Sequence, residues 1–344
     1  MNNLEIHGRS GTCSYMIRDA ESHLHELVGN RRVVVVTDST VHALHGPRFA
    51  GWPQVIIAPG EKQKALPVVH KIYRELMEHE VDRSTILLGV GGGVICDITG
   101  FVAATYLRGI PCGFVPTTLL AQVDASIGGK NGVNLAGYKN LVGTIRQPEF
   151  ILCDPAFLHT LPEQELRFGF AEIIKVAAIA DRSLLTFLSS ARTKLLERDV
   201  DGLRHVIGAA AAIKVRIVDD DETEQGKRRN LNFGHTLGHA IEKVFRSRHG
   251  DAVAIGMTYA AQISVRRNLL PESEAQRLRG IISSFGLPTT IPHDRFHELV
   301  KAMSKDKKRN REHVHMILLR ALGEPVEERL AFKELEEALS FDLH

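Results

Sequence analysis

Four short runs of β-branched and other apolar residues, separated by helical patterns, constrain the fold of the first half of this chain more than any other feature. The runs lie at 33–37, 54–58, 85–90 and 113–118. Runs of this length without polar alternation are typical of strands that are buried on both faces. Between the second and third runs, residues 64–80 carry apolar positions at helical spacing. Strand, helix and strand in succession predict a mainly parallel sheet covered by helices.

The pattern changes after about residue 155, where β-branched runs become rare. We expect helices over 162–180, 182–196, 201–220, 233–246, 250–267, 272–285 and 294–304. At 344 residues the chain exceeds the size at which a single core usually keeps growing. We therefore predict an α/β domain over 1–155 and a mostly α-helical domain over 156–344, with a small-molecule site in the cleft between them.

Composition and charge argue against several kinds of partner. The formal net charge is only +2, so we expect neither a nucleic-acid nor a membrane partner. The dense basic run at 305–311, taken alone, is typical of a solvated turn. We see no apolar stretch long enough to span a bilayer and no signal-peptide pattern. The cysteines, which are Cys13, Cys96, Cys112 and Cys153, form no C-x-x-C pair, which fits a reducing cytoplasm.

A glycine-rich turn follows the third predicted strand. Residues 87–109, LLGVGGGVICDITGFVAATYLRG, are an apolar run, a glycine cluster and a helical pattern. Glycines let a backbone approach phosphate oxygens, and a helix start offers free N–H groups. The turn indicates a pyrophosphate-binding site or only a tight connection, and its spacing fits neither G-x-G-x-x-G nor a P-loop. Asp97, early in the helix, suits a ribose or helix capping.

Polar side chains gather between residues 115 and 143, where glycines separate them and apolar residues flank them. The members are Thr117, Thr118, Asp124, Lys130, Asn134, Lys139 and Asn140. Lysines in such a setting are better placed to meet an anion than to solvate a surface, which favours a binding role. Glu61 and Lys64, in PGEKQK after another strand, suit ribose hydroxyls or phosphate, and equally a solvated loop.

Two histidines, His235 and His239, lie four positions apart in NFGHTLGHAIE, and a glycine directly precedes each. On a helix this spacing places both rings on one face, one turn apart. Two such imidazoles suit a divalent metal, or one metal ligand beside a proton-transfer group, or two half-buried structural histidines. The pair alone does not choose among these three interpretations.

A carboxylate and an ammonium interrupt an apolar helical run. Glu172 and Lys175 lie three positions apart in GFAEIIKVAAIA, and burying them is costly unless they pair or bind a metal. Glu172 is a candidate third metal ligand, because two histidines and a glutamate with an open position form a known zinc arrangement. His249, in RSRHGDAVAIGM, is a further candidate ligand.

Together these segments resemble the 3-dehydroquinate synthase family of sugar-phosphate cyclases, which is related in fold to glycerol dehydrogenase and iron-dependent alcohol dehydrogenases. The stretches that carry the resemblance are PGEKQK, GGGVICD, TYLRG, PTTLLAQVDASIGGK, YKNLVG, GFAEIIK, NLNFGHTLGHAIE and HGDAVAIGM. Nearly the whole chain is covered, from about Asp38 to beyond Lys308. The resemblance implies a Rossmann-like, NAD-binding α/β domain followed by a mostly α-helical domain that binds metal and substrate.

The resemblance also implies a role for each candidate residue. NAD contacts are implied for Asp38, Glu61, Lys64, Gly92, Gly93, Asp97, Thr117, Thr118, Lys139, Phe157 and Thr160. The implied ligands of zinc or cobalt are Glu172, His235 and His249, which leaves His239 as a substrate-phosphate contact and proton-transfer group. The substrate pocket would use Asp124, Lys130, Asn140, Lys175, Lys214, Arg228 and Asn232, together with Lys307 or Lys308. Arg108, in TYLRG, matches a phosphate-binding arginine that the family supplies across a dimer interface, so a homodimer is expected.

Two positions depart from the family's usual pattern. Asp251 stands where the family has glutamate two residues after the ligand histidine, and Cys96 stands where it commonly has glycine. We expect the shorter Asp251 to change the surroundings of His249, and Cys96 to add bulk near the pyrophosphate.

The implied reaction converts 3-deoxy-D-arabino-heptulosonate 7-phosphate to 3-dehydroquinate and phosphate, a step of the shikimate pathway, with NAD regenerated in each turnover. One alternative is a cyclase that acts on sedoheptulose 7-phosphate, against which Asn232, His239 and the DKK segment argue. A polyol or alcohol dehydrogenase is the second, although it would not need a lysine-rich phosphate pocket. The third is a non-catalytic binding module, against which the complete ligand set argues.

Overall fold

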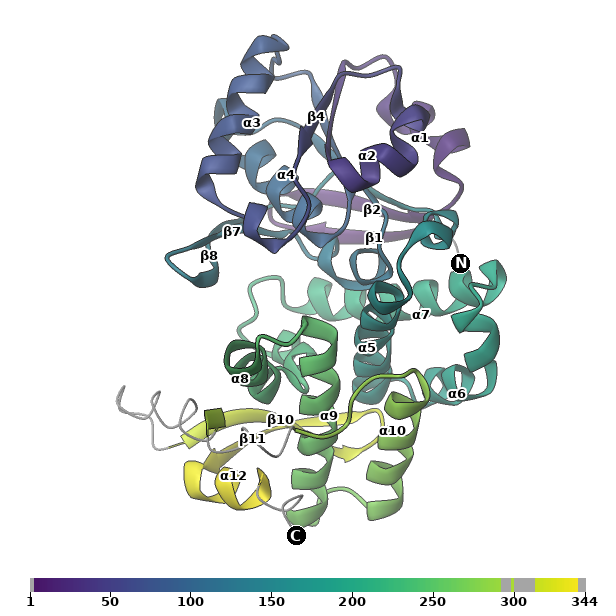
Figure 1. Ribbon diagram of the computed structural model, residues 1–344, viewed down its shortest axis with the longest axis vertical. Helices are drawn as coiled ribbons and strands as arrows, with labels where there is room; N and C mark the ends of the chain where they lie inside the picture. The colour runs from purple at the N-terminus through teal and green to yellow at the C-terminus, as the bar shows by residue number, and fades with distance from the viewer. Residues whose placement is uncertain (1–2, 292–297, 300–312, 340–344) are drawn as a thin grey trace. The chain divides into compact units, whose positions relative to one another are not determined.

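The computed structural model describes residues 3–291, 298–299 and 313–339. The chain forms two compact units (Figure 1). Unit 1 comprises Met1–Leu166 and Leu203–Thr223, and unit 2 comprises Arg167–Gly202 and Glu224–His344. Helices α5 (Glu163–Ala180) and α7 (Val200–Asp220) therefore each carry the chain from one unit to the other. The boundary predicted after residue 155 lies inside unit 1, and the functional division at that point stays a prediction.

The main sheet of unit 1 has seven strands among the described residues, in the order β1-β2-β9-β6-β5-β3-β4. Their bounds are Asn3–Gly8, Gly11–Ile17, Val33–Asp38, Gln54–Ile57, Ile86–Gly91, Cys112–Pro116 and Phe150–Cys153 for β1 to β6 and β9. Neighbouring strands are parallel except β1 and β2. The four predicted strands correspond to β3, β4, β5 and β6, and the parallel sheet is confirmed.

Helices cover this sheet and complete its core. Unit 1 contains α1 (Ala20–Val28), α2 (Ser39–His45), α3 (Leu66–Glu78) and α4 (Gly93–Thr105). Leu24 of α1 joins the same buried cluster as Val35 of β3 and Leu88 of β5. The end of α7 is tied to β1, because the backbone N–H of His7 donates to Asp219 at 2.8 Å.

A separate hairpin, β7 (Lys130–Leu135) and β8 (Tyr138–Ile145), packs against α4 and was not predicted. The approach requires a glycine, since a Cβ on Gly100 of α4 would lie 1.9 Å from the side-chain oxygen of Asn131. Asn131 in turn donates to the carbonyl oxygens of Gly129 and Arg146 at 2.8 and 2.9 Å. The polar cluster predicted at 115–143 therefore lies partly on this hairpin.

Unit 2 is mostly helical, as predicted. Besides most of α5, its described elements are α6 (Arg182–Leu196), α8 (His235–Phe245), α9 (His249–Arg266), α10 (Glu272–Ser284), α12 (Phe332–Leu339) and the strands β10 (His313–Ala321) and β11 (Glu324–Ala331). The hairpin of β10 and β11 was not predicted, and it is joined to α9 by a hydrogen bond from Leu319 N–H to Ser264 Oγ at 3.0 Å. The helix predicted at 294–304 falls largely outside the described residues. None of the helices described has the length and apolar character needed to cross a bilayer.

Candidate metal centre and cofactor site

Glycines allow three helices of unit 2 to meet at close range. A Cβ on Gly256 of α9 would lie 2.0 Å from the carbonyl oxygen of Gly234, and one on Gly238 would lie 3.1 Å from a carbonyl oxygen of α9. A Cβ on Gly250 would lie 2.6 Å from the ring of Phe168 in α5. The glycines that precede the two histidines of α8 thus have a structural purpose, because they let the backbones of α8 and α9 touch.

Glu172 of α5, His235 of α8 and His249 of α9 converge at this junction. Each offers one ligand atom, and these atoms lie within 4.8 Å of one another. The Nε2 atoms of His249 and His235 lie 3.4 and 3.8 Å from Oε1 of Glu172. Two imidazoles and one carboxylate suit zinc or cobalt and leave a coordination position open. The structure therefore brings together the three ligands that the resemblance implied.

The other ring nitrogen of each histidine faces an acceptor. His235 Nδ1 lies 3.2 Å from the carbonyl oxygen of Phe233, and His249 Nδ1 lies 3.7 Å from Oε2 of Glu242. Such partners hold a ligating ring so that its Nε2 lone pair points to the metal. The sequence interpretation missed Glu242, although it follows His235 by two helical turns and so lies on the same face of α8.

Glu172 is deeply buried and lies among basic side chains. Its side chain is 1% exposed, and neither carboxylate oxygen accepts a regular hydrogen bond from the described residues. Lys175 forms an ion pair with it. Burial acts to raise the pKa of Glu172, but Lys175 and the two imidazoles hold this pKa well below its usual range. A buried carboxylate flanked by two imidazoles fits a metal ion.

The two imidazoles differ in protonation. Burial and the Lys175 ammonium lower the pKa of His235 to about 3, so this ring is neutral near pH 7. Burial also acts to lower the pKa of His249, but Glu172 and Glu242 outweigh it and raise the pKa to about 9. Metal binding near neutral pH would therefore displace a proton from His249.

His239 lies beside this centre without belonging to it. Its ring centroid is 5.4 Å from that of His235 and 6.5 Å from that of His249, and its side chain is exposed. The three-residue group that can hold a metal does not include it. Spacing alone treats both histidines of α8 alike, whereas the position of α9 selects His235.

The glycine turn of unit 1 joins β5 to the start of α4. A Cβ on Gly92 would lie 3.0 Å from Thr118, and one on Gly93 would lie 3.0 Å from Ala125. Gly92 caps α4 without a side-chain hydrogen bond, so backbone N–H groups are presented there, as a pyrophosphate would require. Cys96 is 1% exposed, so its bulk is accommodated in the core.

A polar network follows this turn. Lys64 is buried and forms an ion pair with Asp97. Burial raises the pKa of Asp97 to about 6, although Lys64 opposes the shift. Asn134 of β7 donates from its side chain to Glu61 at 2.8 Å and accepts from the backbone N–H of Asn140 at 2.9 Å. The structure therefore connects PGEKQK to the polar cluster.

Candidate substrate residues occur in both units. In unit 1, Lys214 of α7 donates to the backbone and side-chain oxygens of Asp124 at 2.7 and 2.5 Å. In unit 2, Arg228 is 3% exposed on the 3₁₀ turn Lys227–Asn232, and Asn232 donates to Glu224 at 2.7 Å. Glu224 was not predicted, because it lies in a polar loop without periodicity.

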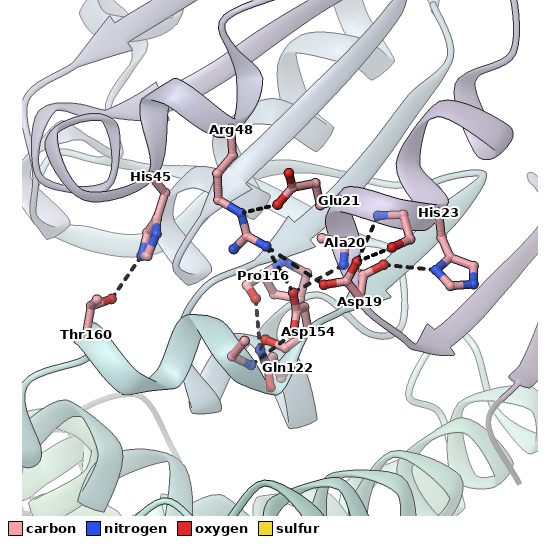
Figure 2. Close-up of polar contacts among 12 residues, drawn as sticks. Asp19, Ala20, Glu21, His23, His45, Arg48, Pro116, Gln122, Asp154 and Thr160 are labelled. Atoms are coloured by element: carbon pink, nitrogen blue, oxygen red, sulfur yellow. Dashed lines mark hydrogen bonds and ion pairs between the residues drawn. The ribbon is translucent and has the colours of Figure 1, made fainter.

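Other predicted cofactor contacts have structural partners. Asp38 caps α2, accepting backbone N–H groups at 2.9 and 3.0 Å. Thr117 is buried, and its N–H donates to a carbonyl oxygen of the glycine turn at 2.9 Å. The hydroxyl of Thr160 lies 2.9 Å from Nε2 of His45 (Figure 2). The side chain of Phe157 is 1% exposed in the core, so only its backbone can face a cofactor. Its predicted contact stays a prediction.

The remaining predicted residues are exposed or lie outside the described residues. Lys130 and Lys139 lie on the β7–β8 hairpin, and Arg108 adopts a left-handed backbone with φ of 67°. Lys307 and Lys308 fall within 300–312, which the structure does not describe.

Asp251 lies in the first turn of α9, two residues after the candidate ligand His249. It is partly buried, and burial raises its pKa while Arg248 opposes the shift. Its expected effect on the surroundings of His249 stays a prediction.

Solved structures with the same fold bind both kinds of cofactor. The chain superposes with a TM-score of 0.88 on 2-epi-5-epi-valiolone synthase from Streptomyces hygroscopicus, which has NAD⁺ and Zn²⁺ bound, at 29% identity and over 97% of both chains. It also matches a 2-deoxy-scyllo-inosose synthase complexed with carbaglucose-6-phosphate, NAD⁺ and Co²⁺, with a TM-score of 0.85 and 25% identity over 98% of this chain and 99% of that one. The fold and the centre thus define the class of NAD- and metal-dependent cyclases.

Sequence similarity narrows this class. Residues 54–168 match the model of the 3-dehydroquinate synthase N-terminal domain, and residues 169–309 match that of the C-terminal domain. A 3-dehydroquinate synthase from Dehalococcoides mccartyi is 41% identical over 321 residues, covering 90% of this chain and 89% of the relative. One from Pyrobaculum islandicum is 39% identical over 301 residues, covering 87% and 88%. The chain belongs to the 3-dehydroquinate synthase family.

Proposed function

We propose that the chain converts 3-deoxy-D-arabino-heptulosonate 7-phosphate to 3-dehydroquinate and phosphate. The observation that carries the proposal is the convergence of Glu172, His235 and His249 in a chain whose relatives of 39–41% identity are 3-dehydroquinate synthases. The activity is that of a phosphate-eliminating carbon–oxygen lyase. It belongs to the shikimate pathway, which leads to the aromatic amino acids.

The cofactors are NAD and a divalent metal, zinc or cobalt. When bound, NAD⁺ would accept and return one hydride, and the metal would polarise the hydroxyl group whose carbon is transiently oxidised to a ketone. Glu172, His235 and His249 would hold the metal in unit 2. In unit 1, the glycine turn at Gly92 and Gly93 would hold the pyrophosphate of NAD, with Asp97, Lys64 and the other predicted contacts around it.

The remaining polar residues supply binding and proton transfer. A phosphate dianion requires cations and hydrogen-bond donors, and we assign this role to Lys130, Asn140, His239 and Arg108. The substrate carboxylate would be bound by Arg228 and Lys214. Lys214 is held by Asp124, and Asn232 by Glu224, so both side chains are positioned before substrate arrives. His239 is exposed beside the centre, where it can exchange a proton with substrate.

Lys175 has a separate role in this proposal. Its ammonium is 2% exposed and paired with Glu172, so it lies directly beside the metal ligands. A fixed positive charge there stabilises negative charge that develops on a substrate oxygen. We therefore assign Lys175 to the substrate pocket together with one of Lys307 and Lys308.

We further propose a homodimer in the cytoplasm. Strand β8 pairs only with β7 among the described strands, and it exposes Tyr138, Leu141 and Ile145 by 57, 58 and 46%. Leu107, which precedes Arg108, is 42% exposed. An uncovered strand edge with apolar side chains is a suitable surface for a second copy. Analytical ultracentrifugation should give a dimer for the parent and a monomer for Leu141→Asp/Ile145→Asp, and a monomeric parent would exclude this proposal.

Phosphate release from the heptulosonate phosphate tests the activity. The assay contains Zn²⁺, and the concentration of NAD⁺ is lower than that of the substrate. NMR identifies the carbon product. The proposal predicts many turnovers per NAD⁺ with 3-dehydroquinate as product. No phosphate release from a protein that holds both cofactors would exclude it, and sedoheptulose 7-phosphate would be the next substrate to test. Stoichiometric NADH from a plain polyol would indicate a dehydrogenase instead.

A further inference from the structure

Two strands of the unit 1 sheet separate at their carboxyl ends, the edge at which α/β sheets bind ligands. Strands β6 and β9 pair only at Gly113 with Phe150 and Phe114 with Ile151 among the described residues. Beyond this point the two strands exchange no ladder bond, and the carbonyl oxygen of Asp154 accepts from Phe157 N–H within its own turn at 3.2 Å. A donor that joins Pro116 to Asp154 must therefore come from elsewhere. A single side chain, that of Gln122, supplies it.

Gln122 lies in the π-helical turn Ala121–Ala125 and is 0% exposed. Its side-chain Nε2 donates to Pro116 at 3.1 Å and to Asp154 at 3.0 Å, as Figure 2 shows. An amide NH₂ has two hydrogens, so both are used. Its backbone carbonyl oxygen accepts from the hydroxyl of Tyr15 at 2.9 Å. The residue is therefore held through its side-chain NH₂ group and through its backbone, without contact with solvent, while its Oε1 has no hydrogen-bond partner among the described residues.

Each of the three segments that meet at Gln122 leads directly to a proposed contact. Pro116 is followed by Thr117 and Thr118, and Asp154 by the 3₁₀ turn that ends at Thr160. Gln122 itself lies two residues before Asp124, the partner of Lys214. One buried amide thus joins the segments that carry three proposed NAD contacts and one proposed substrate contact.

We infer that Gln122 is a positioning residue that sets the NAD⁺ site by bridging the separated strands. The inference rests on the proposed NAD contacts at Thr117, Thr118 and Thr160. Preorganisation of this kind contributes to affinity, because the ligand does not have to order the segments that bind it. Loss of the bridge should therefore weaken NAD⁺ binding beyond its effect on folding.

The chain offers a matched control in Gln54, at the start of β4 in the same unit. Its Nε2 also donates to two backbone carbonyl oxygens, those of Gly46 and Phe49, both at 3.2 Å. None of the residues that it bonds is a proposed contact. Gln54→Met and Gln122→Met each remove two bonds from a side-chain NH₂ group to backbone carbonyl oxygens, and Gln54→Met also removes the contact of Oε1 with Nδ1 of His42 at 2.8 Å. Gln54 is partly buried and holds no proposed contact, so its variant reports what the loss of such bonds does elsewhere in the unit.

The test measures NAD⁺ affinity by isothermal titration calorimetry, together with the unfolding midpoint of each variant. Gln122→Met should bind NAD⁺ about tenfold more weakly, as expected for two lost hydrogen bonds, whereas Gln54→Met should bind like the parent. Gln122→Glu offers one donor when it is protonated, so its affinity should recover in part as the pH falls from 8 to 6. Tyr15→Phe should give a smaller loss of affinity.

The outcomes are separable from the proposed reaction, because NAD⁺ binding is measured without substrate or turnover. Parent-like affinity in both Gln122→Glu and Tyr15→Phe would overturn the inference, even if Gln122→Met fails to fold. Equal losses of affinity in Gln54→Met and Gln122→Met would do the same, since they would show a general effect of destabilisation. A parent that binds NAD⁺ but releases no phosphate would refute the proposed function alone.

Discussion

Two buried carboxylates, Asp154 in unit 1 and Glu172 in unit 2, are equally hidden from solvent but have opposite surroundings. Asp154 is 4% exposed and accepts backbone N–H groups from Ala20 and Ala156 at 3.1 and 2.9 Å. Arg48 lies 3.6 Å from it, and Figure 2 shows how these groups surround the carboxylate. Glu172 is 1% exposed and accepts no regular hydrogen bond from the described residues, and its near neighbours are an ammonium and two imidazoles.

The difference supports the proposal that Asp154 is a structural carboxylate and Glu172 a metal-binding one. Asp154 uses its lone pairs to connect the start of α1 to the turn after β9, so its burial is compensated within the fold. Glu172 is surrounded by one ammonium and two imidazoles in place of backbone N–H groups, and we propose that a metal ion binds among them. Burial alone does not identify a site, so the kind of group that surrounds a buried carboxylate has to be considered as well.

The largest effect on turnover and zinc content is expected from a substitution of Glu172. Glu172→Gln replaces a charged ligand oxygen by an amide, so turnover should fall on the order of a thousandfold. Zinc content, measured by equilibrium dialysis and mass spectrometry, should fall below one ion per chain. Full zinc occupancy in this variant would remove Glu172 from the ligand set.

The next effect tests the helix junction that brings the ligands together. Gly256→Ala places a methyl group against the backbone of α8, because its Cβ would lie 2.0 Å from Gly234 O. Displacement of α8 should weaken zinc affinity by about two orders of magnitude. Gly280→Ala in α10 is the control, since nothing lies within 4 Å of its added Cβ. It should keep zinc affinity and gain up to about 1 kcal/mol of stability. Equal zinc affinity in the two variants would contradict this account of the junction.

A moderate effect tests the structural carboxylate. Asp154→Asn turns one carboxylate oxygen into an NH₂ group that faces a backbone N–H, so the free energy of unfolding should fall by about 2 kcal/mol. Urea denaturation measures this loss. Zinc affinity should stay at the parent value, since Asp154 lies in unit 1 and contacts none of the ligands. A variant with parent stability but reduced zinc binding would reverse the roles given to the two carboxylates.

The smallest effect concerns a third carboxylate, Asp97, which is only partly buried and is paired with Lys64. Its pKa of about 6 in the folded chain exceeds the ordinary value of 3.8. Between these values the folded state keeps a proton that the unfolded state has lost, so the contribution of Asp97 to stability decreases as pH rises from about 4 to about 6. Above this window the contribution is constant.

Asp97→Asn removes this titration, so it provides the reference. Urea denaturation of parent and variant across the window should show the parent losing stability relative to Asp97→Asn as the pH rises. If the parent instead gains stability relative to Asp97→Asn as the pH rises, the ion pair with Lys64 has a larger influence on the pKa of Asp97 than burial has.

Much of the architecture follows from the sequence, because buried parallel strands and long helices have strong local patterns. The run at 33–37 corresponds to β3 and the pattern at 250–267 to α9. Two of the missed elements, β8 and β9, lack such patterns. Strand β8 is exposed over most of its length, so it has no apolar face that the sequence could show. Strand β9 consists of only the four residues Phe150–Cys153, which is too short to show a period.

The site was predictable by residue type but not by arrangement. The sequence shows two histidines one turn apart, and the choice of His235 over His239 depends on how α9 lies against α8. That packing depends on Gly256, whose lack of a side chain has no local signature. Gln122 was missed for a similar reason, since its partners Pro116 and Asp154 are backbone groups that come together only when the sheet forms.

An anomalous diffraction map from zinc-loaded crystals is the most direct test of the metal centre. The account predicts one peak per chain, about 2.0–2.2 Å from a carboxylate oxygen of Glu172 and from Nε2 of His235 and His249. His239 should lie outside the coordination shell, and the peak should be absent from Glu172→Gln crystals. A peak that includes His239 in place of His249, or one located away from Glu172, would contradict the assignment of this carboxylate as the metal-binding one.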